Sequence, residues 1–200
     1  MMKRKIKILV AVIIISCVSL NLYAQDSNQL SYGVKIMAGG RYDNMRMCVG
    51  SDKNVKGGPI ADIMFLANYK LSSGRKLTFE LPVMRPILFG AAFKMLQFEP
   101  EISMEFVSQI NQKKSIVIAP GMGLSLHYGP DYKSDLDNRG DDFFAAGPFF
   151  STLVGLKKIN SINKDRIMGI RFFYTPLFSS ESDLSPGTIL GAAFEMQFGF

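Results

Sequence analysis

The sequence predicts an all-β protein, an eight-stranded antiparallel up-and-down transmembrane β-barrel that follows an N-terminal export signal. Of the 200 residues, 48% are hydrophobic and 12% aromatic. Beyond the N-terminus, however, no apolar run approaches the roughly 20 residues that a membrane helix needs. The apolar residues instead alternate with polar ones in short segments, which is how a membrane barrel distributes its hydrophobicity.

The first 24 residues have the composition of a secretory signal peptide. Residues 3–7 carry four basic side chains, residues 8–15 are all apolar, and the segment ends on the small Ala24. Signal peptides combine a positive start, an apolar middle and a small residue at the cleavage site. We therefore expect cleavage between Ala24 and Gln25, which leaves residues 25–200 as one barrel domain.

Two other fates of the N-terminus stay open. It could remain as an uncleaved anchor, although its apolar stretch is short for a membrane span. It could also be processed as a lipoprotein at Cys17, because the preceding residues loosely resemble a lipobox, although Ile15 is bulky for that position. The second cysteine, Cys48, lies alone in a polar stretch, so a chain without Cys17 has no internal disulfide.

The charge of the chain is concentrated in the signal. The whole sequence has 23 basic and 17 acidic residues, and removing the four basic residues of the signal leaves 19 against 17, or +2. The mature protein is close to neutral, and nucleic acid is therefore not an expected partner.

Polar, glycine-rich gaps divide the mature chain into eight segments with strand-like patterning. Most are close to the roughly 9–11 residues of a tilted membrane strand. The predicted strands are 31–40, 59–71, 76–86, 94–107, 114–128, 142–157, 166–177 and 187–200.

The alternation is clearest in the fourth segment, where one face is apolar and the other is polar. A helix does not sort residues in this way, because a period of two scatters both sets around its circumference. The apolar set is Leu96, Phe98, Pro100, Ile102, Met104 and Phe106, and the polar set is Gln97, Glu99, Glu101, Ser103 and Glu105.

The gaps alternate in length, as the turns and loops of an outer-membrane barrel do. Three are short (72–75, 108–113 and 158–165), and they alternate with gaps at 41–58, 87–93, 129–141 and 178–187. Among the latter, 87–93 fits poorly because it is short and apolar. We predict that the short gaps and both termini are periplasmic and that the longer gaps are extracellular.

A soluble lipocalin-like barrel with its apolar face inward is the main alternative. Two features favour a membrane barrel instead. The polar face of the fifth segment is mostly Ala, Gly and Ser, which suit a crowded interior. Tyrosines also lie on the apolar face near segment ends, as in an interfacial aromatic girdle; they are Tyr32, Tyr69, Tyr128 and Tyr174.

The last strand carries a more specific signal. Apolar residues occupy every second position up to the C-terminus, at Phe194, Met196, Phe198 and Phe200. In this respect the chain resembles the small outer-membrane barrels of the OmpX, OmpW and OmpA-transmembrane type. The resemblance implies that the barrel-assembly machinery recognises these four residues. It also implies a Gram-negative-type envelope, in which outer-membrane lipid and lipopolysaccharide surround the barrel.

Prolines count against uninterrupted strands, because each one lacks a donor for the strand ladder. Five fall within the predicted strands: Pro82, Pro100, Pro120, Pro148 and Pro176. We interpret them as bulge or strand-end sites.

Catalytic and metal chemistry find little support in the sequence. His127 is the single histidine, and Ser125 precedes it by two residues on the same face. This spacing predicts a separation of about 7 Å along the strand, too far for a direct Ser–His contact. The Asp-rich segment 131–142 echoes a calcium loop but lacks its terminal Glu, so we expect a solvated surface loop. No enzyme activity, cofactor or metal is predicted.

The inward face should gather charge if the apolar face meets lipid. Its acids are Asp62, Glu80, Glu99, Glu101, Glu105 and Glu195, and its predicted cations are only Lys35 and Arg171. Lys35, Glu195 and Arg171 lie mid-strand on segments that become neighbours when the barrel closes, which predicts one cluster. Because a buried unpaired carboxylate is costly, the remaining acids would have to be protonated, hydrated or cation-bound.

Three functions follow, in order of preference. The first is a non-enzymatic outer-membrane barrel with a structural or surface-interaction role and an unidentified extracellular ligand. The second is a porin-like, narrow channel for small or hydrophobic solutes, which is disfavoured because side chains normally fill an eight-stranded lumen. The third is a lipid-modifying enzyme.

Overall fold

The computed structural model describes residues 29–44, 56–84, 96–132, 139–158, 166–180 and 186–199. These residues form nine β-strands: β1 Leu30–Asp43, β2 Gly58–Lys70, β3 Lys76–Met84, β4 Leu96–Phe98, β5 Glu101–Asn111, β6 Lys114–Tyr132, β7 Arg139–Lys158, β8 Arg166–Ser179 and β9 Gly187–Gly199. Ala24, Gln25, Cys17, Cys48 and Phe200 lie outside the described residues, as does segment 87–93. Within the described ranges, no helix is long and apolar enough to cross a membrane.

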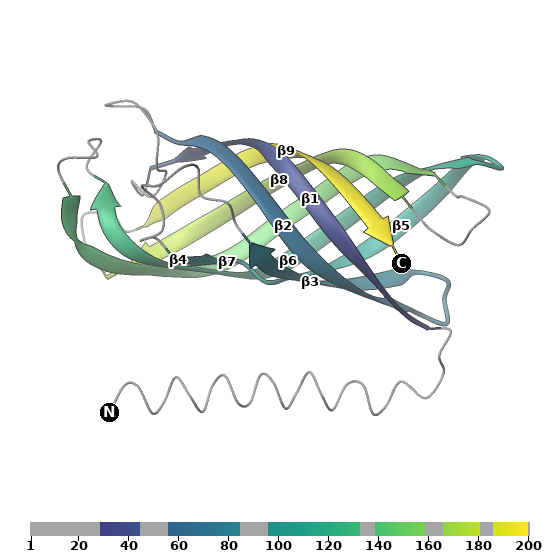
Figure 1. The fold of residues 1–200 in the computed structure, drawn as a ribbon, viewed down its shortest axis with the longest axis horizontal. Coiled ribbons are helices and arrows are strands. Elements are labelled where there is room, and N and C mark those ends of the chain that lie inside the picture. Colours follow the sequence, from purple (N-terminus) through teal and green to yellow (C-terminus); the bar gives the residue numbers. More distant parts are fainter. Residues whose placement is uncertain are drawn as a thin grey trace. The chain divides into compact units, whose positions relative to one another are not determined.

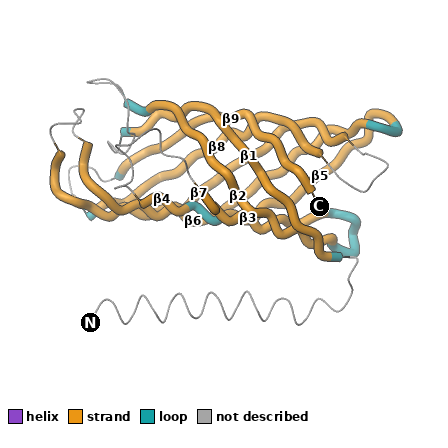
Figure 2. The backbone as a smooth tube through the Cα atoms, in the orientation of Figure 1, coloured by secondary structure: helices purple, strands orange, loops and turns teal. Residues whose placement is uncertain are grey.

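The strands close into one antiparallel barrel (Figures 1 and 2). The strand order is β4-β6-β5-β3-β2-β1-β9-β8-β7, and the pairing of β6 with β7 closes the barrel. The short β4 and the longer β5 lie on the same edge of β6, so they form a single crossing interrupted at Glu99–Pro100. The prediction of an eight-stranded up-and-down barrel is therefore confirmed.

The strand boundaries follow the predicted segments, with several extensions. Strand β1 continues to Asp43, into the gap predicted at 41–58. The β5–β6 connection is a two-residue turn in which Asn111 pairs with Lys114, because β5 continues through residues 108–111 that were predicted to be a gap. Strands β6 and β7 also extend beyond their predicted outer ends, into the Asp-rich segment, where Tyr132 pairs with Arg139.

The prolines divide into two groups. Pro82 lies beside a bulge in the β2–β3 ladder and Pro100 lies in the break between β4 and β5, as predicted. The bulge or strand-end interpretation is wrong for Pro120, Pro148 and Pro176, which lie inside long strands whose register is the same on either side. A strand donates alternate N–H groups to each neighbour, so one proline removes one bond without shifting the register.

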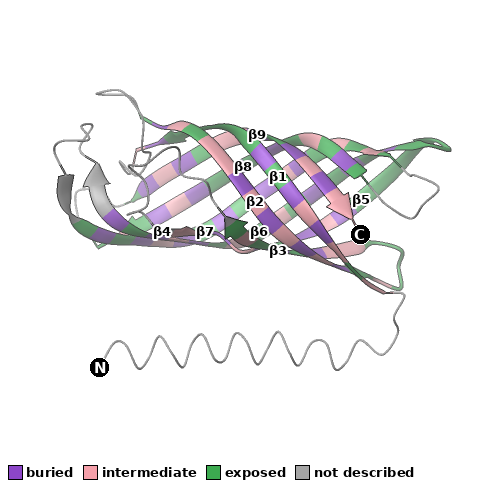
Figure 3. Cartoon of the chain, viewed as in Figure 1, coloured by how far each residue is buried: buried purple, intermediate pink, exposed green. Residues whose placement is uncertain are grey.

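The side chains alternate between a buried lumen and an exposed outer surface (Figure 3). The exposed side chains are large and apolar on every long strand; examples are Ile118, Phe172 and Phe194, each about half exposed. The four predicted girdle tyrosines face outward, and Tyr42 on β1 joins them. An apolar outer surface over a polar interior fits a membrane barrel and not a lipocalin-like one.

The barrel has two ends, which we call the turn rim and the loop rim. The turn rim carries the turns at 71–75 and 112–113 and the ends of β7 and β8 at Lys158 and Arg166. The loop rim is the opposite end, where β1 ends at Asp43 and β9 begins at Gly187.

Candidate functional site: a buried polar network in the lumen

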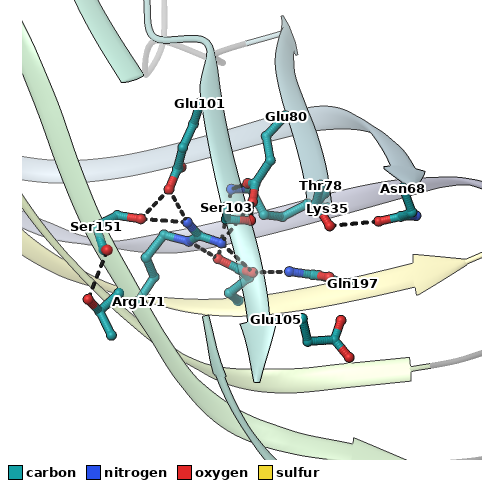
Figure 4. Close-up of polar contacts among 12 residues, drawn as sticks. Lys35, Asn68, Thr78, Glu80, Glu101, Ser103, Glu105, Ser151, Arg171 and Gln197 are labelled. Atoms are coloured by element: carbon teal, nitrogen blue, oxygen red, sulfur yellow. Dashed lines mark hydrogen bonds and ion pairs between the residues drawn. The ribbon is translucent and has the colours of Figure 1, made fainter. Parts of the chain in front are cut away.

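Arg171 on β8 lies at the centre of the lumen and is 1% exposed. Its guanidinium contacts three carboxylates from three different strands (Figure 4). Nε donates to Glu195 Oε2 at 2.5 Å and Nη1 donates to Glu101 Oε1 at 2.6 Å. Nη2 donates to Glu195 Oε1 at 3.2 Å and to Glu80 Oε1 at 3.3 Å.

The fifth guanidinium N–H of Arg171 is also used. Nη1 donates to Ser151 Oγ at 2.7 Å, and the Ser151 hydroxyl in turn donates to Glu101. A guanidinium has five N–H donors in a fixed plane. All five therefore have acceptors, so the geometry of Arg171 is fixed by the strands around it.

Lys35 on β1 completes this central network. Its Nζ donates to Glu80 and lies 3.9 Å from Glu195 Oε2. Ser103 Oγ donates to Glu80 Oε1 at 2.6 Å, and Gln197 Nε2 donates to Glu195 Oε1 at 2.6 Å. Charge-assisted bonds of this kind are about twice as strong as neutral ones. We call Lys35, Glu80, Glu101, Arg171 and Glu195, with Ser103, Ser151 and Gln197, the central network.

The strand register explains how the carboxylates come together. Glu80 and Glu101 are direct partners in the β3–β5 ladder, so their side chains project side by side into the lumen. Glycine makes room for them on β6. A Cβ on Gly121 would lie 2.0 Å from Glu101 Oε1, in the space that the carboxylate occupies.

Glu105 does not join the central network but has its own cations nearer the turn rim. Lys76 Nζ lies 2.5 Å from Glu105 Oε2 and Lys157 Nζ lies 2.7 Å from Oε1. The sequence-based inventory of inward cations was therefore incomplete. Lys76 and Lys157 lie beside the strand ends, where their long stems reach back into the lumen and leave the ammonium groups partly solvated.

Glu99 belongs to a third group, nearer the loop rim. Ser125 Oγ donates to Glu99 Oε1 at 2.6 Å, and Gln97 Nε2 donates to the same oxygen at 3.2 Å. Arg41 Nη1 contacts Gln97 Oε1 at 3.3 Å. Glu80, Glu101 and Glu105 thus have cations, and Glu99 has hydrogen-bond donors, so the expectation that these acids lack protein partners is wrong.

The third group also contains the single histidine. Ser125 Oγ and His127 Nε2 lie 2.6 Å apart, so the prediction that they are too distant for contact is wrong. The backbone estimate ignored that two side chains on the same face can lean toward each other. Glu99 Oε1 approaches the same ring nitrogen, at 3.4 Å. In a catalytic triad the serine and the acid bind different ring nitrogens of the histidine. This arrangement therefore differs from a triad, and Ser125 and His127 are at most 1% exposed.

Apolar side chains occupy part of the remaining lumen, together with further buried polar residues such as Asn68 and Thr78. Val117, Ala119, Leu153 and Ile167 form a buried cluster on β6, β7 and β8. Phe149 and Phe173 stack with ring centroids 6.1 Å apart. Among the described residues there is no group of His, Cys, Asp and Glu side chains suited to hold a metal ion. Most of the Asp-rich segment lies outside those residues, so the calcium question concerns positions that are not described.

Comparison with solved structures agrees with this geometry. Neisserial surface protein A, NspA, aligns with 84% of this chain and 97% of its own at a TM-score of 0.54 and 10% sequence identity. The chain has the fold of the small eight-stranded outer-membrane barrels. Weaker alignments are found with Ail, the attachment invasion locus protein of Yersinia pestis, and with the N-terminal barrel of Pseudomonas aeruginosa OprF.

These two alignments have lower TM-scores than the alignment with NspA. Ail aligns over 86% of this chain and 99% of its own at a TM-score of 0.37 and 11% identity. OprF aligns over 84% and 97% at a TM-score of 0.40 and 13% identity. The sequence matches no protein-family model and no curated protein. At this identity the similarity establishes the fold of a small outer-membrane barrel and nothing finer.

Proposed function

We propose that the protein is a non-enzymatic outer-membrane barrel that is closed to solutes and acts through the segments at its loop rim. The observation that carries this proposal is the central network. Arg171 uses all five N–H groups to bind side chains from four strands that surround the lumen. A fully satisfied buried network makes a rigid obstruction, because moving any member leaves a buried charge unpaired.

A narrow channel remains the alternative of a different class. It would require a water path past Arg171, Lys35 and Glu195, each of which is at most 1% exposed. Leu153 and Phe149 occupy the lumen on the neighbouring β7. Both observations favour the closed barrel.

The exposed apolar surface supports insertion among outer-membrane lipids, with lipopolysaccharide in the outer leaflet and the barrel-assembly machinery as the partner during biogenesis. We infer that residues 1–24 are removed first, between Ala24 and Gln25. The mass of the mature protein would then correspond to a chain that begins at Gln25. A diacylated N-terminal Cys17 would instead show lipoprotein processing.

The surface role depends on the loop rim being extracellular, which cysteine labelling tests. A chain that starts at Gln25 contains Cys48 as its single cysteine, in the segment between β1 and β2. A membrane-impermeant maleimide should label Cys48 on intact cells. In a C48S background, S73C in the 71–75 turn should be labelled only after the outer membrane is permeabilised. The reverse pattern would contradict the orientation, and labelling of neither position in lysed cells would mean that the reagent fails at these positions.

A further inference from the structure

Three cations lie side by side at the turn rim, on the outer surface of the barrel. Lys114 on β6 pairs directly with Lys158 on β7, and Lys158 pairs with Arg166 on β8. All three are exposed. Their neighbours Ser115, Lys157 and Ile167 point into the lumen, so the alternation of the strands turns the three cations outward. We call Lys114, Lys158 and Arg166 the cation row.

Such a row is costly for the isolated barrel. Like charges placed directly opposite one another on adjacent strands are destabilising. Neighbouring strands are about 4.8 Å apart, so the three residues span about 10 Å. Glu105 is the one acid among the described residues near this rim, and it faces the lumen, where Lys76 and Lys157 bind it. By sequence, the 159–165 connection adds one lysine and one aspartate, and so no net charge.

The position of the row identifies the kind of molecule that would compensate it. Two residues further into the barrel wall, the same three strands carry Ile116, Leu156 and Met168, which are again direct partners. These three side chains are between 41% and 51% exposed on the lipid-facing surface. Two residues along a strand cover about 7 Å. The cations therefore lie where the headgroup phosphates of a bilayer would lie if the apolar row meets acyl chains.

A further contact on the same rim fits this placement. The guanidinium of Arg75 in the 71–75 turn lies 5.1 Å from the centre of the Phe106 ring. Phe106 is 41% exposed on the outer surface. A guanidinium over a lipid-facing ring lies in the interface between acyl chains and water, which is where cation–π pairs and aromatic girdles are found.

We propose that the cation row is a binding site for the headgroup of an anionic phospholipid, in the leaflet that the turn rim contacts. The proposal rests on the membrane insertion proposed above and names the lipid that this rim selects. A net-negative headgroup such as phosphatidylglycerol would neutralise repulsion that a zwitterionic headgroup leaves largely in place. A basic side chain near an anionic bilayer surface gives a preference of about fivefold.

The chain contains no tryptophan, so a single introduced indole reports on its own surroundings. M168W places the indole two residues from Arg166 on the lipid-facing side of β8. Y174W places it on the same strand nearer the loop rim, as a matched control. Each variant is reconstituted into vesicles that mix phosphatidylcholine and phosphatidylglycerol, with bromine on the chains of one lipid or the other, and indole quenching is compared.

At low salt we expect brominated phosphatidylglycerol to quench the M168W indole with at least about a fivefold higher relative binding constant than brominated phosphatidylcholine. Near 1 M salt the preference should fall toward one, because charges at the surface are screened over about 3 Å. K114Q/K158Q/R166Q in the M168W background should abolish the preference for phosphatidylglycerol. K56Q/K70Q, which removes two exposed lysines away from the row, should leave this preference unchanged. The Y174W indole should show no comparable preference.

Equal quenching by the two lipids at M168W, in barrels that show heat-modifiable gel mobility, would overturn the headgroup site and leave membrane insertion intact. A preference that survives K114Q/K158Q/R166Q would overturn it as well, and would assign the effect to another part of the surface. Absence of quenching by either lipid at both reporter positions would instead contradict insertion itself, and with it the proposed function.

Discussion

Arg171 and Glu195 form a two-bond ion pair across adjacent strands, although they lie 24 residues apart in the sequence. Nε of Arg171 is 2.5 Å from Glu195 Oε2, and Nη2 is 3.2 Å from Oε1. Both side chains are at most 1% exposed. A planar guanidinium that makes two bonds to one carboxylate adds geometric specificity to the strength of charge-assisted hydrogen bonds.

The E195Q variant should be destabilised. The amide keeps the size of the carboxylate but loses its charge and turns an N–H toward the cations, so Arg171 and Lys35 lose one of the two carboxylates that they share. Removing one member of a buried ion pair costs about 3–5 kcal/mol. The unfolding temperature in detergent, measured from heat-modifiable gel mobility, should fall clearly. D142N, which removes an exposed carboxylate at the loop rim, should leave it unchanged; a wild-type unfolding temperature for E195Q would refute the cluster.

Gly121 should tolerate alanine poorly, because the added Cβ would take the place of the Glu101 carboxylate. Overpacking of this kind costs about 1–3 kcal/mol. G40A is the matched control, since a Cβ on Gly40 would meet its nearest atom, Gly58 O, at an ordinary 3.8 Å. In a detergent melt, G121A should unfold earlier than G40A. Equal melting would mean that Glu101 is free to move away from Arg171.

His127 should have a structural role. With Ser125 and Glu99 it forms a buried hydrogen-bonded group, and no lipid chain reaches Ser125 or His127, which are at most 1% exposed. H127Q and S125A should therefore lower the thermal stability of the barrel and leave lipid A and phospholipid turnover at the level of the membrane without the protein. Wild-type protein that cleaves either lipid, with the activity lost in H127Q, would establish the enzymatic alternative.

The C-terminal residues Phe194, Met196, Phe198 and Phe200 should serve assembly more than packing. Phe194 is 49% exposed on the lipid side, so it contributes little to the interior. Deleting Phe200 should reduce the amount of protein inserted in the outer membrane and leave precursor exposed to periplasmic proteases. F172A, which removes a phenylalanine that is 53% exposed on the lipid-facing side of β8, controls for lost apolar surface. Normal insertion after the deletion would count against recognition of this strand.

The sequence was sufficient for most of the fold because a period of two assigns every residue to one of two faces. It placed Lys35, Arg171 and Glu195 on neighbouring strands, since mid-strand positions on the first and last segments meet when a barrel closes. It did not identify Lys76 or Lys157 as partners of Glu105. The alternation puts both on the inward face, but they lie at strand ends, and whether their long stems reach back to Glu105 depends on barrel tilt and register.

Two further features of the structure could not be predicted from the sequence for similar reasons. The contact between Ser125 and His127 depends on side-chain torsions, which a count of backbone spacing omits. The cation row depends on register across three strands, and Lys114, Lys158 and Arg166 are too far apart in the sequence to form a visible basic run. Register is set by turn geometry and by packing, and single-strand patterns contain neither.

Ion flux through the reconstituted protein tests the central claim, that the network around Arg171 closes the lumen. The wild-type barrel is incorporated into planar bilayers from vesicles in which heat-modifiable mobility shows that it is folded and inserted. The account predicts no stepwise current above that of protein-free bilayers under applied voltage, in low or high salt. Reproducible single-channel steps from the wild-type protein would contradict it, because they require a water-filled path through side chains that are at most 1% exposed.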